Sequence, residues 1–311
     1  MSPTFANANS AMLKVPGAKI YYQVQGKGPV LLMIPGGPAD AGAFADLARL
    51  MADKYKTVSY DPRGNSRSAL DGPPQDQDMD QHGDDAAALI AALGDQPSFV
   101  LGSSGGAQIG LNLASRYPQR VRVLVAHEPP CLQLLPDAEV RLRNAEEVLE
   151  VFRTSGVGPA MQKFAAMAGL GGDRKKKAGP PPPSMQEAFG RIQGNFAYFL
   201  AHGVMPISLY TPDISALEAS KTWVVVGGWR RERRPTGAAL GDVAGDAHGF
   251  EARDVSGWAW RLRRRARRFR PKTRGSAGNS ELTIKSHPRR FYLRTAQRIH
   301  KRRPTGERAR C

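Results

Sequence analysis

The sequence predicts an α/β fold with a mostly parallel, twisted sheet that helices cover on both sides. Strand-like and helix-like segments alternate over the first 228 residues, which is the pattern of a parallel sheet. Several of the expected strands, such as residues 30–34, are continuous apolar runs that suit burial on both faces. A Gly-x-Ser-x-Gly turn at residues 102–106 joins one such strand directly to a helix.

Residue type and spacing justify each element in turn. β-branched and aromatic residues predict strands, apolar residues at helical spacing predict helices, and glycine with proline marks the turns between them. The expected elements, in chain order, are a strand at 18–24, a strand at 30–34, a helix at 43–52, a strand at 56–60, a helix at 84–93, a short strand from Ser98 into the Gly-x-Ser-x-Gly turn, a helix from Gly105, and a strand at 122–126.

The pattern changes to helices alone between about residues 135 and 215, which predicts an inserted helical cap. A link rich in glycine, lysine and proline, residues 169–183, interrupts it. Residues 222–228 return to a buried strand. The expected organisation is therefore a core at 10–134, a cap at 135–215, a core strand at 216–228 and an atypical stretch at 229–311. Apolar positions of this cap recur at helical spacing and indicate packing: Phe189, Ile192, Phe196, Phe199 and Leu200.

The net positive charge of the chain comes entirely from its last stretch. The 311 residues include 45 Lys and Arg and 28 Asp and Glu, for a formal net charge of +17. Residues 1–228 contain 21 of each sign, so the whole excess lies in residues 229–311. A nucleic-acid partner is therefore a hypothesis for that stretch alone.

Two interpretations of residues 229–311 stay open. The first is a disordered basic arm that neutralises phosphates and binds less tightly as salt increases. The second is a change of reading frame near codon 229, because out-of-frame translation of a GC-rich gene yields mostly arginine, glycine, alanine and proline. The second interpretation explains why charge balance and periodicity end at the same residue.

The cysteine count and the patterns that the sequence lacks indicate a compartment and bear on which cofactors to expect. The two cysteines, Cys131 and Cys311, do not form a disulfide framework, which favours a reducing compartment. The first residues lack a signal-peptide pattern and no apolar run has membrane-spanning length, so a cytoplasmic protein without a membrane partner is expected. No metal-ligand spacing is present, and no Gly-x-Gly-x-x-Gly unit opens the sheet, so no metal and no cofactor is expected.

The Gly-x-Ser-x-Gly turn places a hydroxyl where a nucleophile is needed. Gly102 and Gly106 remove Cβ atoms that would collide across a sharp strand-to-helix turn. Ser104 lies at its apex, and the amide of Gly105 at the helix N-terminus faces any oxyanion that forms there. Ser103 is a competing hydroxyl in the variable position of the motif. The alternative is a glycine-rich loop with a surface serine; the flanking strand and helix favour a nucleophile at Ser104.

Together with this turn, three further segments resemble the α/β-hydrolase family over about residues 10–228. They are Met-Ile-Pro-Gly-Gly-Pro at 33–38, Tyr-Asp-Pro-Arg-Gly-Asn-Ser-Arg-Ser at 60–68, and Ala-Ser-Arg-Tyr-Pro-Gln-Arg-Val at 114–121. The resemblance implies an α/β-hydrolase fold with Gly37 and Gly105 as the oxyanion-hole amides. Pro35 stands where a histidine is usual, and Arg63 is expected to brace neighbouring loops.

The same resemblance implies a catalytic acid after strand 222–228 and a histidine one strand later. Glu232 is the carboxylate within reach of the acid position, with Asp242 and Asp246 as later options. His248, in Gly-Asp-Ala-His-Gly-Phe, is the candidate base, although its spacing differs by one from the family turn and no strand precedes it.

The remaining histidines have other expected roles. His127 ends a strand on the active-site edge and is expected to line the pocket. Ordinary surface or packing roles are expected for His82, His202, His287 and His300.

The sequence thus predicts a serine hydrolase that acts on an ester or similar acyl bond of a small apolar substrate through an acyl-enzyme at Ser104. Epoxide hydrolase or haloalkane dehalogenase chemistry is disfavoured because those relatives carry aspartate at the position of Ser104. One alternative is a catalytically impaired scaffold that lacks the base and acid after residue 228, and another is nucleic-acid association through residues 229–311. The sequence does not indicate the oligomeric state.

Overall fold

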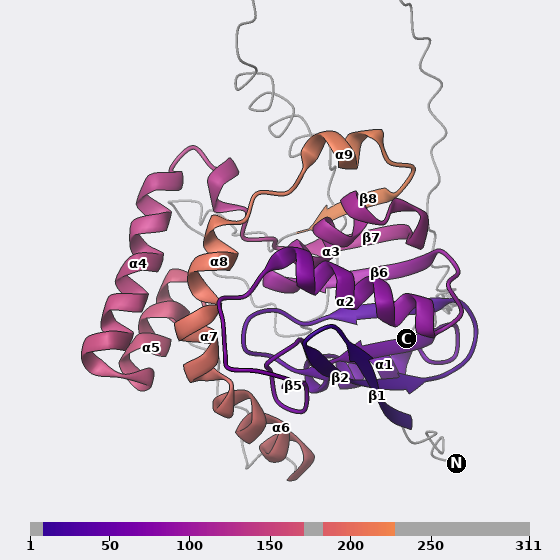
Figure 1. Ribbon diagram of the computed structural model, residues 1–311, viewed down its shortest axis with the longest axis horizontal. Coiled ribbons are helices and arrows are strands. Elements are labelled where there is room, and N and C mark those ends of the chain that lie inside the picture. Colours follow the sequence, from indigo (N-terminus) through magenta and orange to yellow (C-terminus); the bar gives the residue numbers. More distant parts are fainter. Residues whose placement is uncertain (1–8, 171–182, 228–311) are drawn as a thin grey trace, which may run out of the picture. The chain divides into compact units, whose positions relative to one another are not determined.

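The computed structural model describes residues 9–170 and 183–227 (Figure 1). The described strands form one sheet in the order β1-β2-β4-β3-β6-β7-β8, with β5 paired to the side of β2. Pairing is parallel from β4 through β3, β6 and β7 to β8, and antiparallel where β2 meets its partners. The strands are β1 Asn9–Val15, β2 Ala18–Gln25, β3 Val30–Ile34, β4 Lys56–Tyr60, β5 Ala69–Leu70, β6 Ser98–Ser103, β7 Val121–His127 and β8 Trp223–Gly227.

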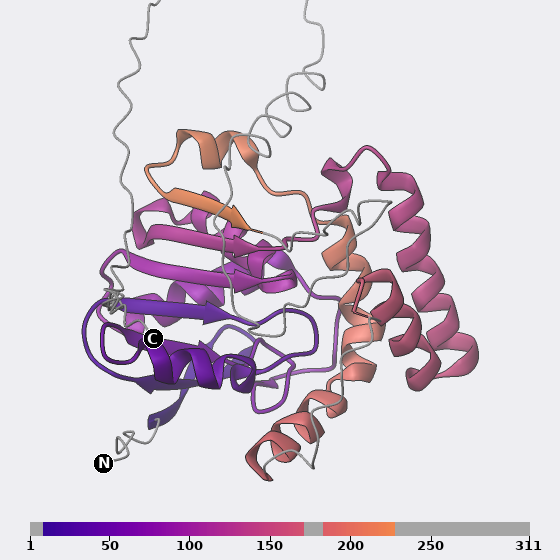
Figure 2. The same cartoon turned by 180° about the vertical axis from the view of Figure 1, so that it is seen from behind.

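Helices lie on both faces of this sheet, as the alternation of segments predicted. Helices α2 and α3 lie on one face and α1 on the other (Figures 1 and 2). The described α-helices are α1 Ala45–Met51, α2 Met79–Ala92, α3 Gly105–Arg116, α4 Ala138–Ser155, α5 Val157–Met167, α6 Pro183–Gly194, α7 Phe196–His202, α8 Val204–Leu209 and α9 Ile214–Ala219; short 3-10 turns are η1 Ala41–Phe44, η2 Pro118–Arg120 and η3 Leu132–Leu134.

Three elements of the N-terminal half differ from the sequence prediction. Strand β1 and the short β5 were not expected, and both pair with β2. Helix α2 begins at Met79, five residues before the predicted start, because the Asp78 side chain accepts a hydrogen bond from the Asp80 amide and caps the helix there.

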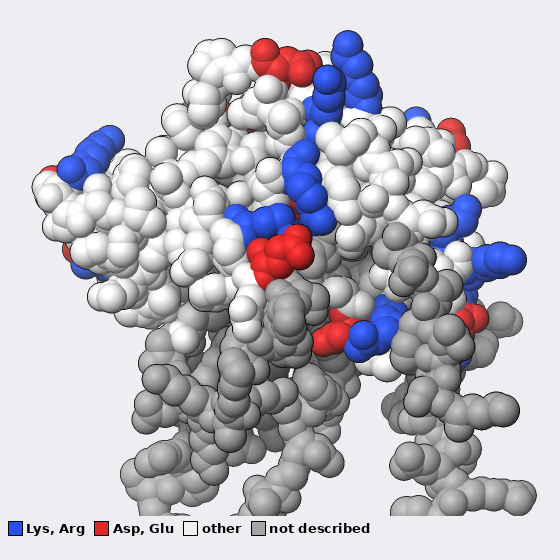
Figure 3. Space-filling model, turned by 90° about the horizontal axis from the view of Figure 1, so that it is seen from below, with Lys and Arg blue, Asp and Glu red and all other residues white. Residues whose placement is uncertain are grey.

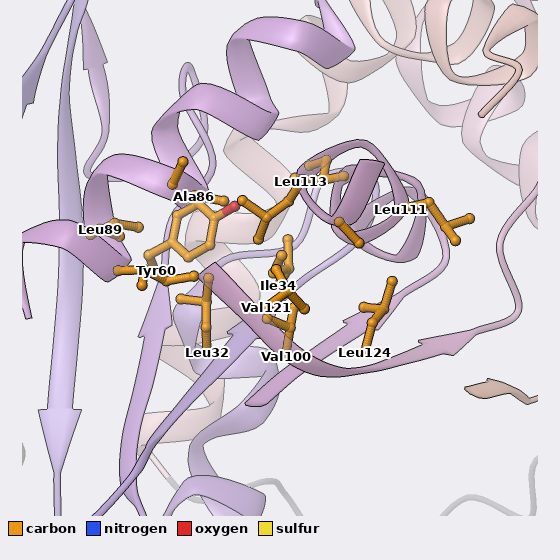
Figure 4. Close-up of a cluster of buried hydrophobic side chains, with 14 of the residues drawn as sticks. Leu32, Ile34, Tyr60, Ala86, Leu89, Val100, Leu111, Leu113, Val121 and Leu124 are labelled. Carbon is orange, nitrogen blue, oxygen red and sulfur yellow. The ribbon is translucent and has the colours of Figure 1, made fainter. Parts of the chain in front are cut away.

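The main hydrophobic core lies between the sheet and helices α2 and α3 (Figure 4). Leu32 and Tyr60 from the sheet and Leu113 from α3 are fully buried in it. Burial raises the pKa of the Tyr60 hydroxyl well above its usual range, chiefly because the phenolate would be desolvated. This core fixes the strands whose carboxyl ends carry the candidate site.

The prediction that residues 222–228 form a buried strand is wrong in part. Strand β8 is present, but it lies at the edge of the described sheet, and Trp223 is 66% exposed. Val224 and Val226 pack on the main core, whereas Val225 on the opposite face is half-buried. Figure 2 shows no described helix over β7 and β8 on that face. In the described part of the chain, the apolar run that forms β8 is therefore packed on the core through one face only.

Residues 138–209 fold into helices α4–α8, at least where they are described, which agrees with the helices expected at 135–215. The predicted row of apolar positions from Phe189 to Leu200, called here the apolar stripe, is interrupted at Asn195, between α6 and α7. Phe199 and Leu200 are buried, but Phe189 is 58% exposed, so the stripe does not pack as a single face. These helices lie beyond the carboxyl ends of β6, β7 and β8 (Figure 2).

Charged side chains of both signs are interspersed on the face shown in Figure 3, in keeping with the charge balance of residues 1–228. Among the described residues, no helix is long and apolar enough to cross a membrane.

Candidate active site

Ser104 lies alone between the end of β6 and the start of α3. Its backbone has φ 54° and ψ −125°, a left-handed conformation that a residue with a side chain rarely adopts. Its amide donates a hydrogen bond to the carbonyl of His127 at 2.8 Å, which ties the turn to the end of β7. The residue is exposed. A strained, exposed hydroxyl at the carboxyl edge of a parallel sheet is the geometry expected of a functional turn.

Three glycines explain why the chain can turn here. A Cβ on Gly102 would lie 2.3 Å from the carbonyl oxygen of Gly106, and a Cβ on Gly106 would lie 2.2 Å from that of Ile34. A Cβ on Gly36 would lie 2.3 Å from the carbonyl oxygen of Ser103. Backbone atoms cannot swing aside as a side chain can, so the ends of β3 and β6 and the start of α3 meet only because these positions lack a Cβ.

The amides of Gly37 and Gly105 belong to neighbouring segments. The Gly37 nitrogen lies 3.5 Å from the position that a Cβ on Gly105 would occupy. Gly105 is the first residue of α3, where backbone N–H groups have no acceptor within the helix and the helix dipole attracts negative charge. Two backbone donors therefore lie together beside Ser104.

The turn from Gly36 to Ala39, called here the 36–39 turn, is held from the core by Asn65. The side-chain nitrogen of Asn65 donates to the carbonyl oxygens of Gly37 and Ala39, each at 3.1 Å. Gly37 itself has φ +55°, and the Ala39 amide closes the turn onto the Gly36 carbonyl at 3.1 Å. Asn65 is 1% exposed. Although it lies within the 60–68 segment singled out in the sequence, no role was predicted for it.

Asn195, from the break between α6 and α7, holds the same turn from the other side. Its side-chain nitrogen donates to the Pro38 carbonyl at 2.8 Å and to the Ser66 hydroxyl at 2.9 Å, and its oxygen accepts from the Ser66 amide at 2.7 Å. The sequence carries no local signal for this contact, because Asn195 and Pro38 are 157 residues apart.

Buried carboxylates surround these turns, and arginines pair with them. Asp61 accepts a hydrogen bond from the Ala41 amide at 2.9 Å and forms an ion pair with Arg67 at 2.8 Å. Asp40 forms an ion pair with Arg191 of α6 at 2.8 Å. Both carboxylates are fully buried, so pairing is what makes their charge tolerable there.

Arg63 braces the 60–68 segment, the role expected from the sequence. Its guanidinium binds both carboxylate oxygens of Asp85, at 2.8 and 2.6 Å, and also donates to Gln81 at 2.9 Å. Burial raises the pKa of the Asp85 carboxyl, although the hydrogen bonds and charge of Arg63 act in the opposite direction. The Arg63 guanidinium thus makes structural contacts with α2, as expected for a bracing residue.

Apolar side chains from α7 and α8 contact the two glycines that carry the amide donors. A Cβ on Gly37 would lie 3.5 Å from the Phe199 ring, and a Cβ on Gly105 would lie 3.2 Å from Cδ1 of Ile207. The Phe199 ring is itself packed edge-on against Phe164, with ring centroids 5.0 Å apart. An apolar surface therefore borders the two amides.

His127 ends β7, and its Nδ1 lies 3.3 Å from the hydroxyl oxygen of Ser103, its register partner on β6. The contact involves Ser103 and not Ser104, and a pocket-lining role for His127 stays a prediction. The next residue, Glu128, is exposed and has φ +50°, and its amide donates to the Gly227 carbonyl at 2.8 Å. Like Ser104 after β6, Glu128 directly follows a strand and has a positive φ, and no signal in the sequence marked it.

Two other described histidines have structural environments. His82 of α2 is fully buried, neither ring nitrogen has a hydrogen-bond partner among the described residues, and burial together with the charge of Arg63 lowers its pKa to about 3. His202 lies with its Nδ1 3.0 Å from Asp76. Cys131 is a buried free thiol whose pKa burial raises to about 12. None of these groups belongs to the Ser104 site.

Several predicted site residues lie outside the described part of the chain. They are Glu232, His248 and the alternative acids Asp242 and Asp246, together with His287, His300 and the whole basic stretch 229–311. The base, the acid and the nucleic-acid hypothesis therefore stay predictions.

A polar cavity of about 420 Å³ lies beside the 60–68 segment. Arg63, Gln81 and Tyr198 line it, together with residues of the loop before α2. Ser104, Gly37 and Gly105 are not among its lining residues, so the cavity is separate from the candidate active site.

Known proteins that are similar to this chain indicate its family. A model of the alpha/beta hydrolase fold family matches residues 29–188, more than half of the chain. The protein named "Uncharacterized hydrolase YraK" from Bacillus subtilis (strain 168) is 38% identical over 210 residues, which are 68% of this chain and 73% of that protein. The chain belongs to the α/β-hydrolase family.

Other α/β-hydrolase similarities are more distant. A zearalenone hydrolase from Cladophialophora bantiana is 33% identical over 140 residues, covering 42% of this chain and 52% of that protein. The structure of a thermophilic esterase from Thermogutta terrifontis superposes with a TM-score of 0.53 at 20% identity, covering 71% of this chain and 80% of that one. The predicted α/β-hydrolase fold is confirmed.

Proposed function

We propose that this α/β-hydrolase cleaves an ester or similar acyl bond of a small apolar substrate through an acyl-enzyme at Ser104. The observation that carries the proposal is the strained, exposed Ser104 with the amides of Gly37 and Gly105 beside it. Hydrolase relatives support the reaction class.

In the proposed reaction, the Ser104 oxygen attacks the acyl carbon while its proton passes to a general base. The carbonyl oxygen becomes an oxyanion that accepts hydrogen bonds from the Gly37 and Gly105 amides. One such donor contributes ~3 kcal/mol to transition-state stabilisation. The intermediate then expels the leaving alcohol, which takes the proton from the base, and water releases the acyl group by the same steps.

The helices α4–α8 are proposed as the cap over this site. Phe199 and Ile207 bring apolar surface against the two oxyanion donors, which supports an apolar group next to the scissile carbonyl. The buried stretch of the cap around Phe199 includes Ala145, Val148 and Leu200. A substrate with a compact apolar acyl group fits this border better than a charged one.

His248 and Glu232 are proposed as base and acid, on the sequence resemblance alone. A serine hydroxyl is a poor nucleophile at neutral pH without such a base. Loss of the base would lower turnover by a factor on the order of a million and would leave the impaired scaffold described above.

Labelling with a fluorophosphonate probe, which reacts with activated serines, tests the proposal. We expect the wild type and Ser103→Ala to be labelled and Ser104→Ala to remain unlabelled. Ser103→Ala is a matched control, since it removes the neighbouring hydroxyl. Labelling of Ser104→Ala at the wild-type rate would contradict the nucleophile assignment, and an unlabelled wild type would favour the impaired scaffold. Slower labelling of His248→Ala would support the base.

A further inference from the structure

We propose that Asn195 is a positioning residue that holds the Gly37 amide in its oxyanion-binding orientation, so that the cap must be docked for the oxyanion hole to be complete. The proposal rests on the proposed function, because it assigns a partner to the same site. The juxtaposition that carries it is a buried cap asparagine whose amide group is bonded to both turns of the core that meet at Gly37.

The side-chain hydrogen bonds of Asn195 are all made to the core. The nitrogen donates to the Pro38 carbonyl at 2.8 Å and to the Ser66 hydroxyl at 2.9 Å, while the oxygen accepts from the Ser66 amide at 2.7 Å. The side chain is nearly inaccessible, with the residue 5% exposed. Ser66 has φ +48°, so Asn195 also holds a residue in an unfavourable backbone conformation.

Asn195 lies directly before helix α7, yet its side chain does not cap that helix. Asparagine directly before a helix commonly accepts a hydrogen bond from the first turn of that helix. Asn195 precedes α7, but its side chain makes no such capping bond. Its polar atoms serve the core instead, which a purely local role would not require.

Other cap residues meet the same turn beside Asn195. Phe199 lies one helical turn later on α7, and its ring is 3.5 Å from the position of a Cβ on Gly37. Arg191 of α6 binds the buried Asp40, immediately after the 36–39 turn, at 2.8 Å. The cap therefore contacts the turn through a hydrogen bond and an aromatic ring, and the residue after the turn through an ion pair.

The 36–39 turn needs such external support because its own backbone supplies little. Gly37 has access to more backbone conformations than other residues, and Pro38 has no N–H to donate. A single backbone bond, Ala39 to Gly36, closes the turn among the described contacts. Asn65 binds the Gly37 and Ala39 carbonyls from the core, and Asn195 binds the Pro38 carbonyl between them from the cap. Three consecutive carbonyls are thus held by two asparagines.

A displaced donor is a poor donor, because a shift of about 1 Å in a reacting group can lower the rate about a hundredfold. Asn195→Asp is the sharpest variant, because it keeps the size and the acceptor for the Ser66 amide but removes the nitrogen that donates to the Pro38 carbonyl and the Ser66 hydroxyl. We expect kcat for p-nitrophenyl acetate to fall between about ten- and a hundredfold, with KM changed by less than about twofold. Fluorophosphonate labelling should slow in parallel.

Matched controls separate positioning from general stability. Asn144→Ala makes a change in an exposed asparagine of cap helix α4, and we expect wild-type kcat, KM and labelling. Ser66→Ala removes only the hydroxyl acceptor and leaves the amide that donates to Asn195. We expect its kcat to stay within about threefold of wild type, since the bond to Pro38 remains.

Hydrogen–deuterium exchange of the peptide that contains residues 36–40 gives a readout that requires no activity. We expect faster exchange there in folded Asn195→Asp and in Asn195→Ala than in wild type or Asn144→Ala. Wild-type exchange in both variants, or an effect of Asn195→Asp on KM alone, overturns the proposal. An unlabelled wild type would instead defeat the proposed function, while the exchange experiment would still decide whether Asn195 holds the turn.

Discussion

Two turns meet at the candidate active site, and different forces hold them in place. The elbow, which is the Gly-x-Ser-x-Gly turn at residues 102–106, is held by close backbone packing at glycines, with carbonyl oxygens 2.2 to 2.3 Å from where a Cβ would lie. The 36–39 turn is held by the side-chain amides of Asn65 and Asn195. Packing of this kind tolerates no added atom, whereas a hydrogen-bonded turn can loosen gradually. The supports of the two proposed oxyanion donors, the Gly37 and Gly105 amides, should therefore respond differently to mutation.

The largest expected effect comes from Gly106→Ala. The new Cβ would lie 2.2 Å from the Ile34 carbonyl oxygen and 2.6 Å from that of Pro35, both backbone atoms. We expect the unfolding free energy to fall by about 3 kcal/mol or more, or folding to fail. Gly110→Ala, in the same helix, meets the end of the buried Leu124 side chain at 2.7 Å, and after the gain in helix propensity it should cost about 1 to 2 kcal/mol. Urea denaturation measures both, and equal losses would contradict the packing account.

Asn65→Asp should weaken the hydrogen-bonded turn more than any change at Asn195. It removes the donor to two carbonyl oxygens and places a buried carboxylate against them. We expect the unfolding free energy to fall by about 2 kcal/mol and kcat to fall about a hundredfold. Ester hydrolysis and urea denaturation measure these changes, with exposed Asn144→Asp as the control. A variant with wild-type kcat would show that the Gly37 carbonyl needs no such donor.

Away from the two turns, acid should destabilise the fold through the buried His82 of α2. Burial and the charge of Arg63 lower its pKa to about 3, so below pH 6.5 the unfolded chain binds a proton that the folded chain does not. Stability is therefore lost as the pH falls from about 6.5 towards 3, by at most about 1.4 kcal/mol per pH unit. His82→Leu should flatten this slope and leave the stability at pH 7 nearly unchanged, since neither ring nitrogen is bonded within the described residues. Denaturation at pH 7, 6 and 5 measures it; an unchanged slope in the variant would refute the assignment.

The smallest effect is expected at a glycine that packs against nothing. A Cβ on Gly190 of α6 has no atom within 4 Å and the residue is exposed. Because alanine is the better helix former, Gly190→Ala should raise the unfolding free energy by about 0.5 to 1 kcal/mol. Thermal denaturation measures this gain. A loss of stability instead would contradict the comparison, because a glycine with open space around it should tolerate the Cβ that the glycines of the elbow do not.

The comparison also explains what could be predicted from the sequence. The elbow was predicted because its cause is local: the glycines at 102 and 106 flank the serine within five residues, between a strand and a helix. The alternation of strands and helices, and the helical segment that follows β7, were predicted from periodicity in the same way. The buried state of strand 222–228 was not predicted correctly, because periodicity reports apolar character and not whether a neighbour covers each face.

The support of the 36–39 turn could not be predicted, since it depends on residues far apart in the chain. Asn65 is 28 residues from Gly37, and Asn195 is 157 residues from Pro38. A single asparagine carries no signal of its partner, and Asn195 is recognisable only once the break between α6 and α7 places it beside Pro38 and Ser66.

Trapping the acyl-enzyme tests the central claim most directly. Mixing the protein with p-nitrophenyl acetate and quenching in acid should give an initial burst of about one p-nitrophenol per chain. Peptide mass spectrometry should then locate one acetyl group on Ser104 in the wild type and in Ser103→Ala, and none at this turn in Ser104→Ala. Acetyl groups on Ser103, or acetyl groups only on scattered lysines with no burst, would contradict the account.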